Sequence, residues 1–333
     1  MASTKTRSSL LPYPLIDMKI KYLFPIAYLT TCYFLLATNA NAAALGLSLS
    51  PSIVEAAIKP GKTITQAYSF QNQSDTEQTF VARIIPFVSG DSNGNPSLKP
   101  NLRPDWLKYF SLSNSDIKLN EPFSLPANQS TQIILTVSVP NKAVYSDLYA
   151  TLLVSTVVKN NQGTGSTFGA AIGSNLIITV SPQSHPPALI KVTDFYPNKD
   201  SFLFHYADYY ISDSLTSIHF TAIAKNLGKY FTKTSGLIRI DRGDVNISTQ
   251  TLLPNNILAN SERKLEASPS GEIVFQPNLT TLGSYQVNLD LRSENSSSHA
   301  ELILLILPLK AGLGTIISIV ILWFGLRLVS KKK

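Results

Sequence analysis

The stretch that decides the fold is residues 130–140, which read STQIILTVSVP. Apolar side chains recur at every second position, at Ile133, Leu135, Val137 and Val139, and a proline closes the run. Successive side chains of a β-strand point to opposite faces of the sheet, so this period of two predicts a strand with one buried face. Two other stretches repeat the pattern, and they contain the following residues: Ile218, Phe220, Ala222 and Ala224, and Tyr285, Val287, Leu289 and Leu291.

The rest of residues 45–308 fits the same interpretation. Dense apolar runs at 152–158 and 176–180 are typical of strands at or near a core. The 20 prolines and 16 glycines of the chain fall mostly between the apolar runs and act as turn signals. No apolar stripe with a helical period of useful length occurs before residue 311. The sequence therefore predicts an all-β body.

A polar, proline-rich stretch at 181–187, SPQSHPP, divides this body. Such a composition suits a semi-rigid linker and not a central strand. We expect one β-sandwich over 43–182, a linker over 183–187 and a second β-sandwich over 188–308.

The two halves share three landmarks in the same order. A strand ends on an asparagine, an Ala-Asn pair follows, and a tyrosine opens a late apolar strand. The residues are Asn72, Ala127-Asn128 and Tyr149 in the first half, and Asn226, Ala259-Asn260 and Tyr285 in the second. A tyrosine at that place is typical of immunoglobulin-like (Ig-like) sandwiches, where its hydroxyl bonds to nearby backbone. We predict two tandem Ig-like β-sandwiches.

The net charge of +7 comes from the two ends of the chain. Residues 1–42 carry a balance of +3, residues 311–333 carry +4, and the stretch between them has equal numbers of basic and acidic residues. A nucleic-acid-binding protein needs clustered lysines and arginines on its folded body. We therefore expect no nucleic-acid partner, and we assign the basic ends to membrane topology.

The N-terminal region has the features of an exported leader. A short basic segment, MKIK at 18–21, precedes an apolar stretch at 22–37 and then small residues. We assign residues 1–42 to a leader with a signal peptide, cleaved between Ala42 and Ala43. Translation starts either at Met1 or at Met18. Cys32, the only cysteine, resembles a lipid-attachment site only loosely, and one cysteine forms no internal disulfide.

The C-terminal region predicts a membrane anchor. Residues 311–329 are 19 residues with no polar face, about 28 Å of helix, which nearly matches the hydrocarbon core of a bilayer. A basic tail over 330–333 follows, and Arg327, Lys331, Lys332 and Lys333 mark the cytoplasmic side. A cleaved glycolipid-anchor signal is the main alternative, but basic residues after the apolar stretch favour a stop-transfer helix. We expect a single-pass cell-membrane protein with its body outside.

The first half resembles two families of Ig-like domains. Ser50-Pro51-Ser52-Ile53-Val54-Glu55, Lys59-Pro60-Gly61-Lys62 and Tyr68-Ser69-Phe70-Gln71-Asn72 give an edge strand, a Pro-Gly turn and a strand ending on Asn. Pilus-assembly chaperones share this opening. So do bacterial WxL-interacting surface proteins, which also have a signal peptide, two Ig-like domains, a membrane helix and a basic tail.

Further passages resemble the WxL-interacting proteins. They are Ser138-Val139-Pro140-Asn141-Lys142-Ala143 before Tyr149, and Leu282-Gly283-Ser284-Tyr285. That resemblance implies cell-wall attachment by the first domain and protein binding by the second. The chaperones are soluble and anchor a subunit carboxylate through a basic residue on the first strand, where this chain has Ile53 and Val54.

Residues with the chemistry of an enzyme or metal site are sparse. The four histidines lie at no metal-ligand spacing, and no nucleophile elbow or phosphate-binding loop is present. We expect no enzyme activity, no cofactor and no metal. The segment 90–96 and the tripeptide Arg242-Gly243-Asp244 are each explained by a hairpin turn.

Exposed aromatic residues are the candidates for surface binding. Trp106 is either a platform for a sugar or part of the first core, and core packing is favoured. Tyr209 and Tyr210 are candidates on the second sandwich, while alternation puts Phe202, Phe204 and Tyr206 on one face, which we expect to be the inner one.

The sequence therefore predicts a non-enzymatic, membrane-anchored cell-surface protein. It would bind or scaffold envelope components, either a cell-wall polymer or surface proteins, and contact the lipid bilayer through 311–329. The alternative is a membrane-tethered, chaperone-like factor for exported surface subunits.

Overall fold

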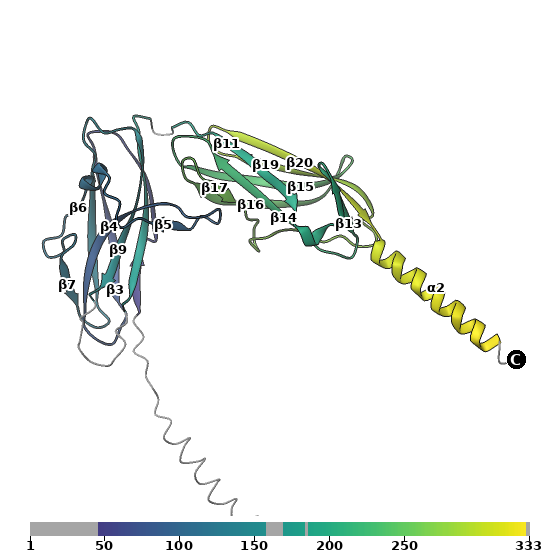
Figure 1. The fold of residues 1–333 in the computed structure, drawn as a ribbon. Helices are drawn as coiled ribbons and strands as arrows, with labels where there is room; N and C mark the ends of the chain where they lie inside the picture. Colours follow the sequence, from purple (N-terminus) through teal and green to yellow (C-terminus); the bar gives the residue numbers. More distant parts are fainter. Residues whose placement is uncertain (1–45, 158–168, 184–185, 331–333) are drawn as a thin grey trace, which may run out of the picture. The chain divides into compact units, whose positions relative to one another are not determined.

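The computed structural model describes residues 46–157, 169–183 and 186–330, all within one compact unit, Leu45–Lys333. These residues form two β-sandwiches and a C-terminal helix (Figure 1). The predicted leader, its cleavage site at Ala42 and Ala43, and the tail lysines 331–333 lie outside the described residues. The fold class is all-β, with two tandem Ig-like sandwiches.

The first sandwich has a four-stranded and a six-stranded sheet. The four-stranded sheet has the order β1 (Leu47–Ser50), β3 (Thr63–Asn72), β8 (Ser130–Ser138), β6 (Phe110–Leu112). The six-stranded sheet has the order β2 (Ile53–Ile58), β10 (Ala171–Val180), β9 (Ser146–Thr156), β4 (Gln78–Ser89), β5 (Pro96–Leu98), with β7 (Pro122–Leu125) also on β4. Strand β2 runs parallel to β10, and a short 3₁₀ helix, η1 (Asp105–Tyr109), precedes β6.

The second sandwich repeats this arrangement. One sheet has the order β11 (Ile190–Pro197), β14 (Ile218–Asn226), β17 (Glu262–Lys264), with β18 (Ile273–Phe275) also on β14. The other has the order β12 (Phe204–Tyr206), β13 (Tyr209–Asp213), β20 (Ser297–Leu307), β19 (Gly283–Arg292), β15 (Thr232–Arg242), β16 (Val245–Ile257). Strand β13 runs parallel to β20, and a 3₁₀ turn, η2 (Lys199–Ser201), precedes β12.

Each sandwich has its own hydrophobic core. The three stretches with a period of two form β8, β14 and β19, and the apolar residues named for them are all buried. Phe70, Phe80 and Phe123 pack together in the first core, with centroids of Phe70 and Phe80 4.9 Å apart. The periodic signal therefore identified the strands and their inner faces correctly.

The asparagine landmarks perform the same task in both halves. Asn72 ends β3 and Asn226 ends β14, and both are fully buried. The side-chain amide of Asn72 donates to the carbonyls of Leu125 (3.0 Å) and Pro126 (3.1 Å), and that of Asn226 donates to the carbonyl of Ile257 (3.0 Å). Both therefore satisfy buried carbonyls between the two sheets.

The Ala-Asn pairs also match, because Asn128 and Asn260 both adopt φ of 58°. Asparagine is among the few residues other than glycine that tolerate this left-handed conformation.

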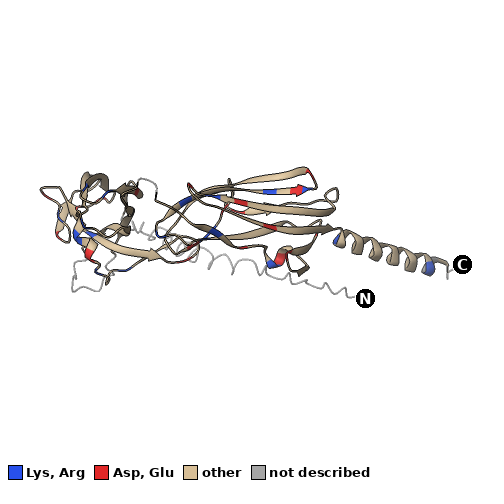
Figure 2. Ribbon diagram, turned by 90° about the horizontal axis from the view of Figure 1, so that it is seen from above, with Lys and Arg blue, Asp and Glu red and all other residues tan. Residues whose placement is uncertain are grey.

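The C-terminal helix α2 (Leu309–Ser330) is long and apolar enough to span a bilayer, and none of its candidate span, Leu309–Arg327, is buried in the protein. Among its described side chains, charge is confined to Lys310 and Arg327 near its two ends (Figure 2). The guanidinium of Arg327 lies 4.6 Å from the ring centroid of Trp323, a geometry suited to a membrane interface.

Candidate binding cleft

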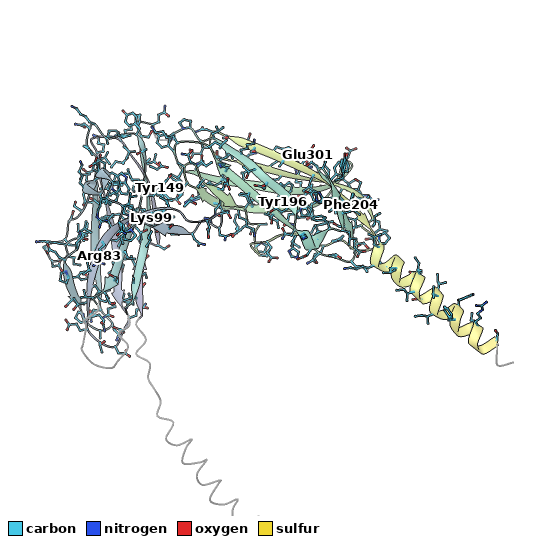
Figure 3. The ribbon with its side chains drawn as sticks, viewed as in Figure 1. Arg83, Lys99, Tyr149, Tyr196, Phe204 and Glu301 are labelled. Atoms are coloured by element: carbon cyan, nitrogen blue, oxygen red, sulfur yellow. The ribbon has the colours of Figure 1, made fainter. Side chains whose placement is uncertain are left out.

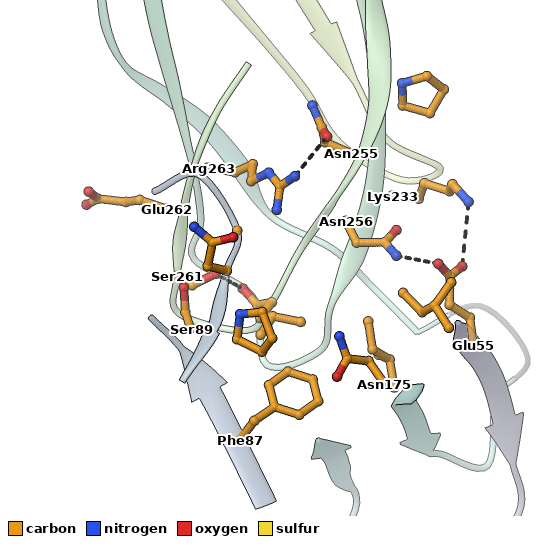
Figure 4. A pocket seen from close by; sticks show the side chains of 17 residues that line it. Glu55, Phe87, Ser89, Asn175, Lys233, Asn255, Asn256, Ser261, Glu262 and Arg263 are labelled. Atoms are coloured by element: carbon orange, nitrogen blue, oxygen red, sulfur yellow. Dashed lines mark hydrogen bonds and ion pairs between the residues drawn. The ribbon is translucent and has the colours of Figure 1, made fainter. Parts of the chain in front are cut away.

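The candidate site is a cleft of about 390 Å³ lined by strands of both sandwiches (Figure 4). The first sandwich contributes β2, β10 and the β4–β5 hairpin, and the second contributes β15, β16 and β17 with the turn between the last two. Its apolar lining includes Ile53, Phe87 and Ile177, and the remaining lining is largely amide, hydroxyl and charged groups. A lining of this mixed kind is typical of sites that hold a polar ligand segment.

Three buried polar atoms of the lining have no hydrogen-bond partner among the described residues. They are Nδ2 of Asn255, Oδ1 of Asn256 and Nε of Arg263. All three atoms are buried within the walls of the cleft and are not on the surface that a ligand would touch. Buried polar groups of folded proteins are nearly always paired. The walls of the cleft therefore carry an unmet hydrogen-bonding capacity.

The charged groups of the cleft are partly engaged with each other. Glu55 accepts a hydrogen bond from the amide of Asn256, and its Oε2 lies 3.6 Å from Nζ of Lys233. Glu262 is held by Lys225 outside the lining, at 2.9 Å. Arg263 donates to the side chain of Asn255 at 3.3 Å, and no carboxylate of the described residues forms an ion pair with it.

A buried carboxylate holds the junction between the two sandwiches, beside the cleft. Asp147 on β9 accepts hydrogen bonds from the hydroxyls of Tyr149 (2.6 Å) and Thr179 (2.8 Å) and from the backbone N–H of Phe231 in the second sandwich. The Tyr149 hydroxyl in turn accepts from the backbone N–H of Ala259, at 2.9 Å. The expected tyrosine bond to nearby backbone is therefore replaced by a link to the other sandwich.

Burial changes the pKa values of both Asp147 and Tyr149. It raises the pKa of the Asp147 carboxyl, against the opposing effect of hydrogen bonds from Tyr149, Thr179 and Phe231. Burial also raises the pKa of Tyr149, and the negative charge of Asp147 raises it further. Tyr149 therefore stays protonated and remains a donor to the carboxylate.

The β4–β5 hairpin closes one side of the cleft. Its turn follows the prediction for residues 90–96, since Ser89 pairs with Pro96. The hairpin extends toward the second sandwich, where the Ser92 carbonyl accepts from the N–H of Lys264 at 2.6 Å (Figure 1). Gly94 has φ of +82°, and a Cβ there would lie 1.0 Å from Nη1 of Arg263. Only glycine allows both this backbone conformation and the close approach of the guanidinium.

The candidate residues named from the sequence lie elsewhere. Trp106 is half-buried against the first core, with its ring centroid 5.8 Å from that of Phe110. Tyr210 packs against the second core and stacks on His205, with centroids 5.5 Å apart, whereas Tyr209 is exposed. None of the three lines the cleft.

The expectation that Phe202, Phe204 and Tyr206 form an inner face is wrong. Phe204 and Tyr206 are 61% and 76% exposed, and Phe204 is labelled in Figure 3 near the start of α2. They belong to β12, an edge strand that pairs only with β13 among the described strands. The exposure of their side chains shows that no second sheet covers this face of the strand. Alternation shows which side chains share a face, but it does not show whether that face is covered.

The Arg242-Gly243-Asp244 segment forms the turn between β15 and β16, with φ of 57° at Gly243. In the described part of the chain, no group of three or more histidine, cysteine, aspartate or glutamate side chains is placed to hold a metal.

The cleft itself was missed by sequence reasoning. Its lining comes from strands more than 200 residues apart, and asparagine, serine and lysine are common in solvent-exposed loops. The one local signal was Gly94 in the 90–96 segment, whose role depends on a partner in the other sandwich.

Comparison with known proteins yields similarity of fold only. No family model and no curated protein matches the chain. Among solved structures, a chaperone–tip adhesion subunit pre-assembly complex from archaic chaperone-usher Csu pili of Acinetobacter baumannii is similar, with 11% identity, 79% of this chain and 99% of that chain covered, and a TM-score of 0.34. The class 5 fimbriae chaperone CfaA has 14% identity, 79% and 100% coverage, and a TM-score of 0.38. The E. coli chaperone DraB has 9% identity, 78% and 97% coverage, and a TM-score of 0.34.

The resemblance to pilus-chaperone domains thus has counterparts among solved structures, while the resemblance to WxL-interacting proteins stays a prediction. At these identities and TM-scores the function proposed below depends on this chain's own residues.

Proposed function

We propose that the chain is a non-enzymatic, membrane-anchored envelope protein that binds a peptide segment of an exported or surface protein in its cleft. The observation that carries the proposal is the lining of the cleft, where the apolar Ile53, 45% exposed, lies beside polar side chains such as Asn95 and Asn175. An extended peptide offers its backbone groups to polar side chains, and its own side chains meet the apolar lining at Ile53 and Phe87. Helix α2 would hold the body at the outer face of the cell membrane, with Arg327 on the cytoplasmic side.

A binding role suits the acidic groups of the cleft. Glu55 and Glu262 are both engaged by lysines, at 3.6 Å and 2.9 Å, so neither carboxylate is set up as a free acid or base. A cell-wall polymer is the other partner class, because sugar hydroxyls also pair with amides. The peptide is favoured because the apolar lining lies beside amide and hydroxyl groups, which suits alternating backbone and side-chain contacts.

A chaperone-like role is the second candidate function, and the edge of β10 favours it. Residues Asn175–Val180 of β10 pair with β2, whereas Ala171–Ser174 pair only with β9. No strand of the described residues forms a ladder with the other edge of that stretch, although β1 lies near β10, and the stretch leads directly to Asn175 in the cleft lining. A client segment bound in the cleft would be able to continue along this edge as an added strand.

Site-specific photo-crosslinking in cells tests the proposal. A photoreactive phenylalanine analogue replaces Ile53, which lines the cleft and is 45% exposed, and the control position is Leu237, which is 40% exposed on β15 and outside the cleft. We expect a discrete protein adduct from position 53 only, weakened by Asn256→Ala. An adduct with polymer, or equal adducts at both positions, would contradict the peptide proposal. Protection of the 171–174 amides from hydrogen exchange in the adduct would indicate strand addition.

A further inference from the structure

The end of the second sandwich next to α2 exposes apolar side chains at several separate loops. Register identifies this end, because β20 enters α2 after Leu307, and the following elements terminate at the same level. Strand β13 ends at Asp213 opposite Leu307, β19 begins at Gly283 opposite Ile306, and Gly283 contacts Arg242 in the β15–β16 turn. The exposed apolar residues here are Leu203, Leu215, Val245, Leu279 and Leu309.

The start of the helix is tied to this end and does not hang from a free linker. The backbone N–H of Lys310 donates to Oδ2 of Asp213 at 2.7 Å, and its ammonium donates to the Thr216 hydroxyl at 2.7 Å. The N–H of Ser214 donates to the Leu307 carbonyl at 2.9 Å. The 213–216 turn, which carries Leu215, is therefore fixed beside the first turn of α2.

The other exposed apolar residues of this end lie around the helix and some distance from it. Val245 lies on β16, three strands from β20, which is about 14 Å at the usual strand spacing. Leu279 lies in the loop that joins β18, in the opposite sheet, to β19, and it is 52% exposed. Leu203 precedes β12, on the other side of β20 from β16. The apolar tips thus span the whole end of the sandwich and not one edge of it.

Charges near these tips suit a lipid headgroup layer. Lys199, Arg242 and Lys310 are exposed at this end, together with the acids Asp200 and Asp244. Cationic side chains near apolar anchors meet phosphates while their stems lie along apolar surface. Scattered apolar residues are normal on a protein surface. Exposed apolar residues on several loops around a membrane helix, however, all lie next to the bilayer that the helix spans.

We propose that this end of the second sandwich rests on the membrane, with Leu203, Leu215, Val245 and Leu279 inserted at the headgroup boundary around α2. The occupant of this surface is the bilayer that α2 spans, so the proposal depends on α2 as the anchor but not on the cleft. Contact at several points restrains the tilt of the second sandwich on its helix. A protein held by the helix alone would be free to tilt.

The test uses the full chain in phosphatidylcholine nanodiscs. Cys32, the only native cysteine, is changed to serine, and single cysteines carrying an environment-sensitive fluorophore replace Leu215, Val245, Leu279 or, as a control, Leu237. Leu237 is exposed in the same sheet but pairs with Asp290, which pairs with His299, eight residues before Leu307, or about 26 Å away. Quenching by spin-labelled lipid is measured for each site.

We expect quenching at Val245 and Leu279 to equal that at Leu215 and to exceed that at Leu237 several-fold. Quenching at Leu215 alone would overturn the proposal, because the helix would then hold the sandwich away from the surface. No quenching at any site would overturn it together with the anchoring role of α2. Neither result would affect the crosslinks from the cleft, which test the proposed function separately.

Discussion

Removal of the Asp147 carboxylate is the sharpest test of the junction. In Asp147→Ala, the hydroxyls of Tyr149 and Thr179 and the N–H of Phe231 all lose their acceptor. Thr179 and Phe231 both line a neighbouring cavity that admits water in place of the carboxylate, so Tyr149 is the donor left without its acceptor. An unsatisfied buried donor costs roughly 1–3 kcal/mol. The expected loss in the free energy of unfolding, after relief of the buried charge, is therefore about 1–3 kcal/mol.

The matched control is Asp147→Asn, which keeps the shape and removes the charge. Its amide oxygen accepts from Tyr149, and its amide nitrogen donates to the Thr179 hydroxyl, so both stay paired. We expect its stability at neutral pH to stay within about 1 kcal/mol of the parent.

The stabilities of Asp147→Asn and of the parent protein should depend differently on pH. The pKa of Asp147 is raised in the folded state, so its stabilising contribution is fully present below the unfolded pKa and is lost as pH rises through the folded pKa. The stability of Asp147→Asn relative to the parent should therefore increase from about pH 4 upward, and then level off.

Urea denaturation followed by tryptophan emission measures these differences. The chain has two tryptophans, and Trp323→Phe leaves Trp106 as a reporter of the first sandwich. A Trp106 transition in Asp147→Ala within about 0.5 kcal/mol of the parent would refute the reasoning, because the buried Tyr149 donor would then have cost almost nothing. Equal losses for the Ala and Asn variants would refute it too, since only the Ala variant removes the acceptor.

Two further predictions concern the hairpin and the anchor. Gly94→Ala should release the hairpin from Arg263 and speed hydrogen exchange of the Lys264 amide. The control is Gly271→Ala, at φ of +79° with nothing within 4 Å, which should leave exchange of the Lys264 amide unchanged. Equally fast exchange of that amide in both variants would show that backbone strain, and not the missing space, matters. A chain ending at Pro308 should appear in the medium or the soluble envelope fraction on cell fractionation, and its retention in the membrane would contradict the anchoring role of α2.

The strands and their repeat were readable from the sequence because their signals are local. A period of two over seven residues fixes a buried face, as β8, β14 and β19 show. Asn72 and Asn226 were recognisable because each ends an apolar strand before a polar turn, although their bonds to distant carbonyls were not.

The parts of the site that depend on long-range contacts were not readable. Tyr149 was identified as a structural tyrosine, but its hydroxyl bridges to Ala259, more than 100 residues later. Asn255 and Arg263 face a space that exists only when both sandwiches are assembled. Phe204 and Tyr206 were misplaced because the pattern of an edge hairpin does not reveal that its second face is uncovered.

The junction has a physical feature that core formation does not explain. Each sandwich closes its own apolar core, so neither needs the other to bury its strands. Yet the junction buries Asp147 at a cost in desolvation, places Gly94 against a guanidinium and leaves the amide of Asn255 unpaired. Features that weaken folding persist where they fix the geometry of a binding site, because a preorganised site loses less entropy when it binds. We infer that the contacts of Asp147 and Gly94 hold the cleft walls at a set separation, so that a ligand meets a lining already in place.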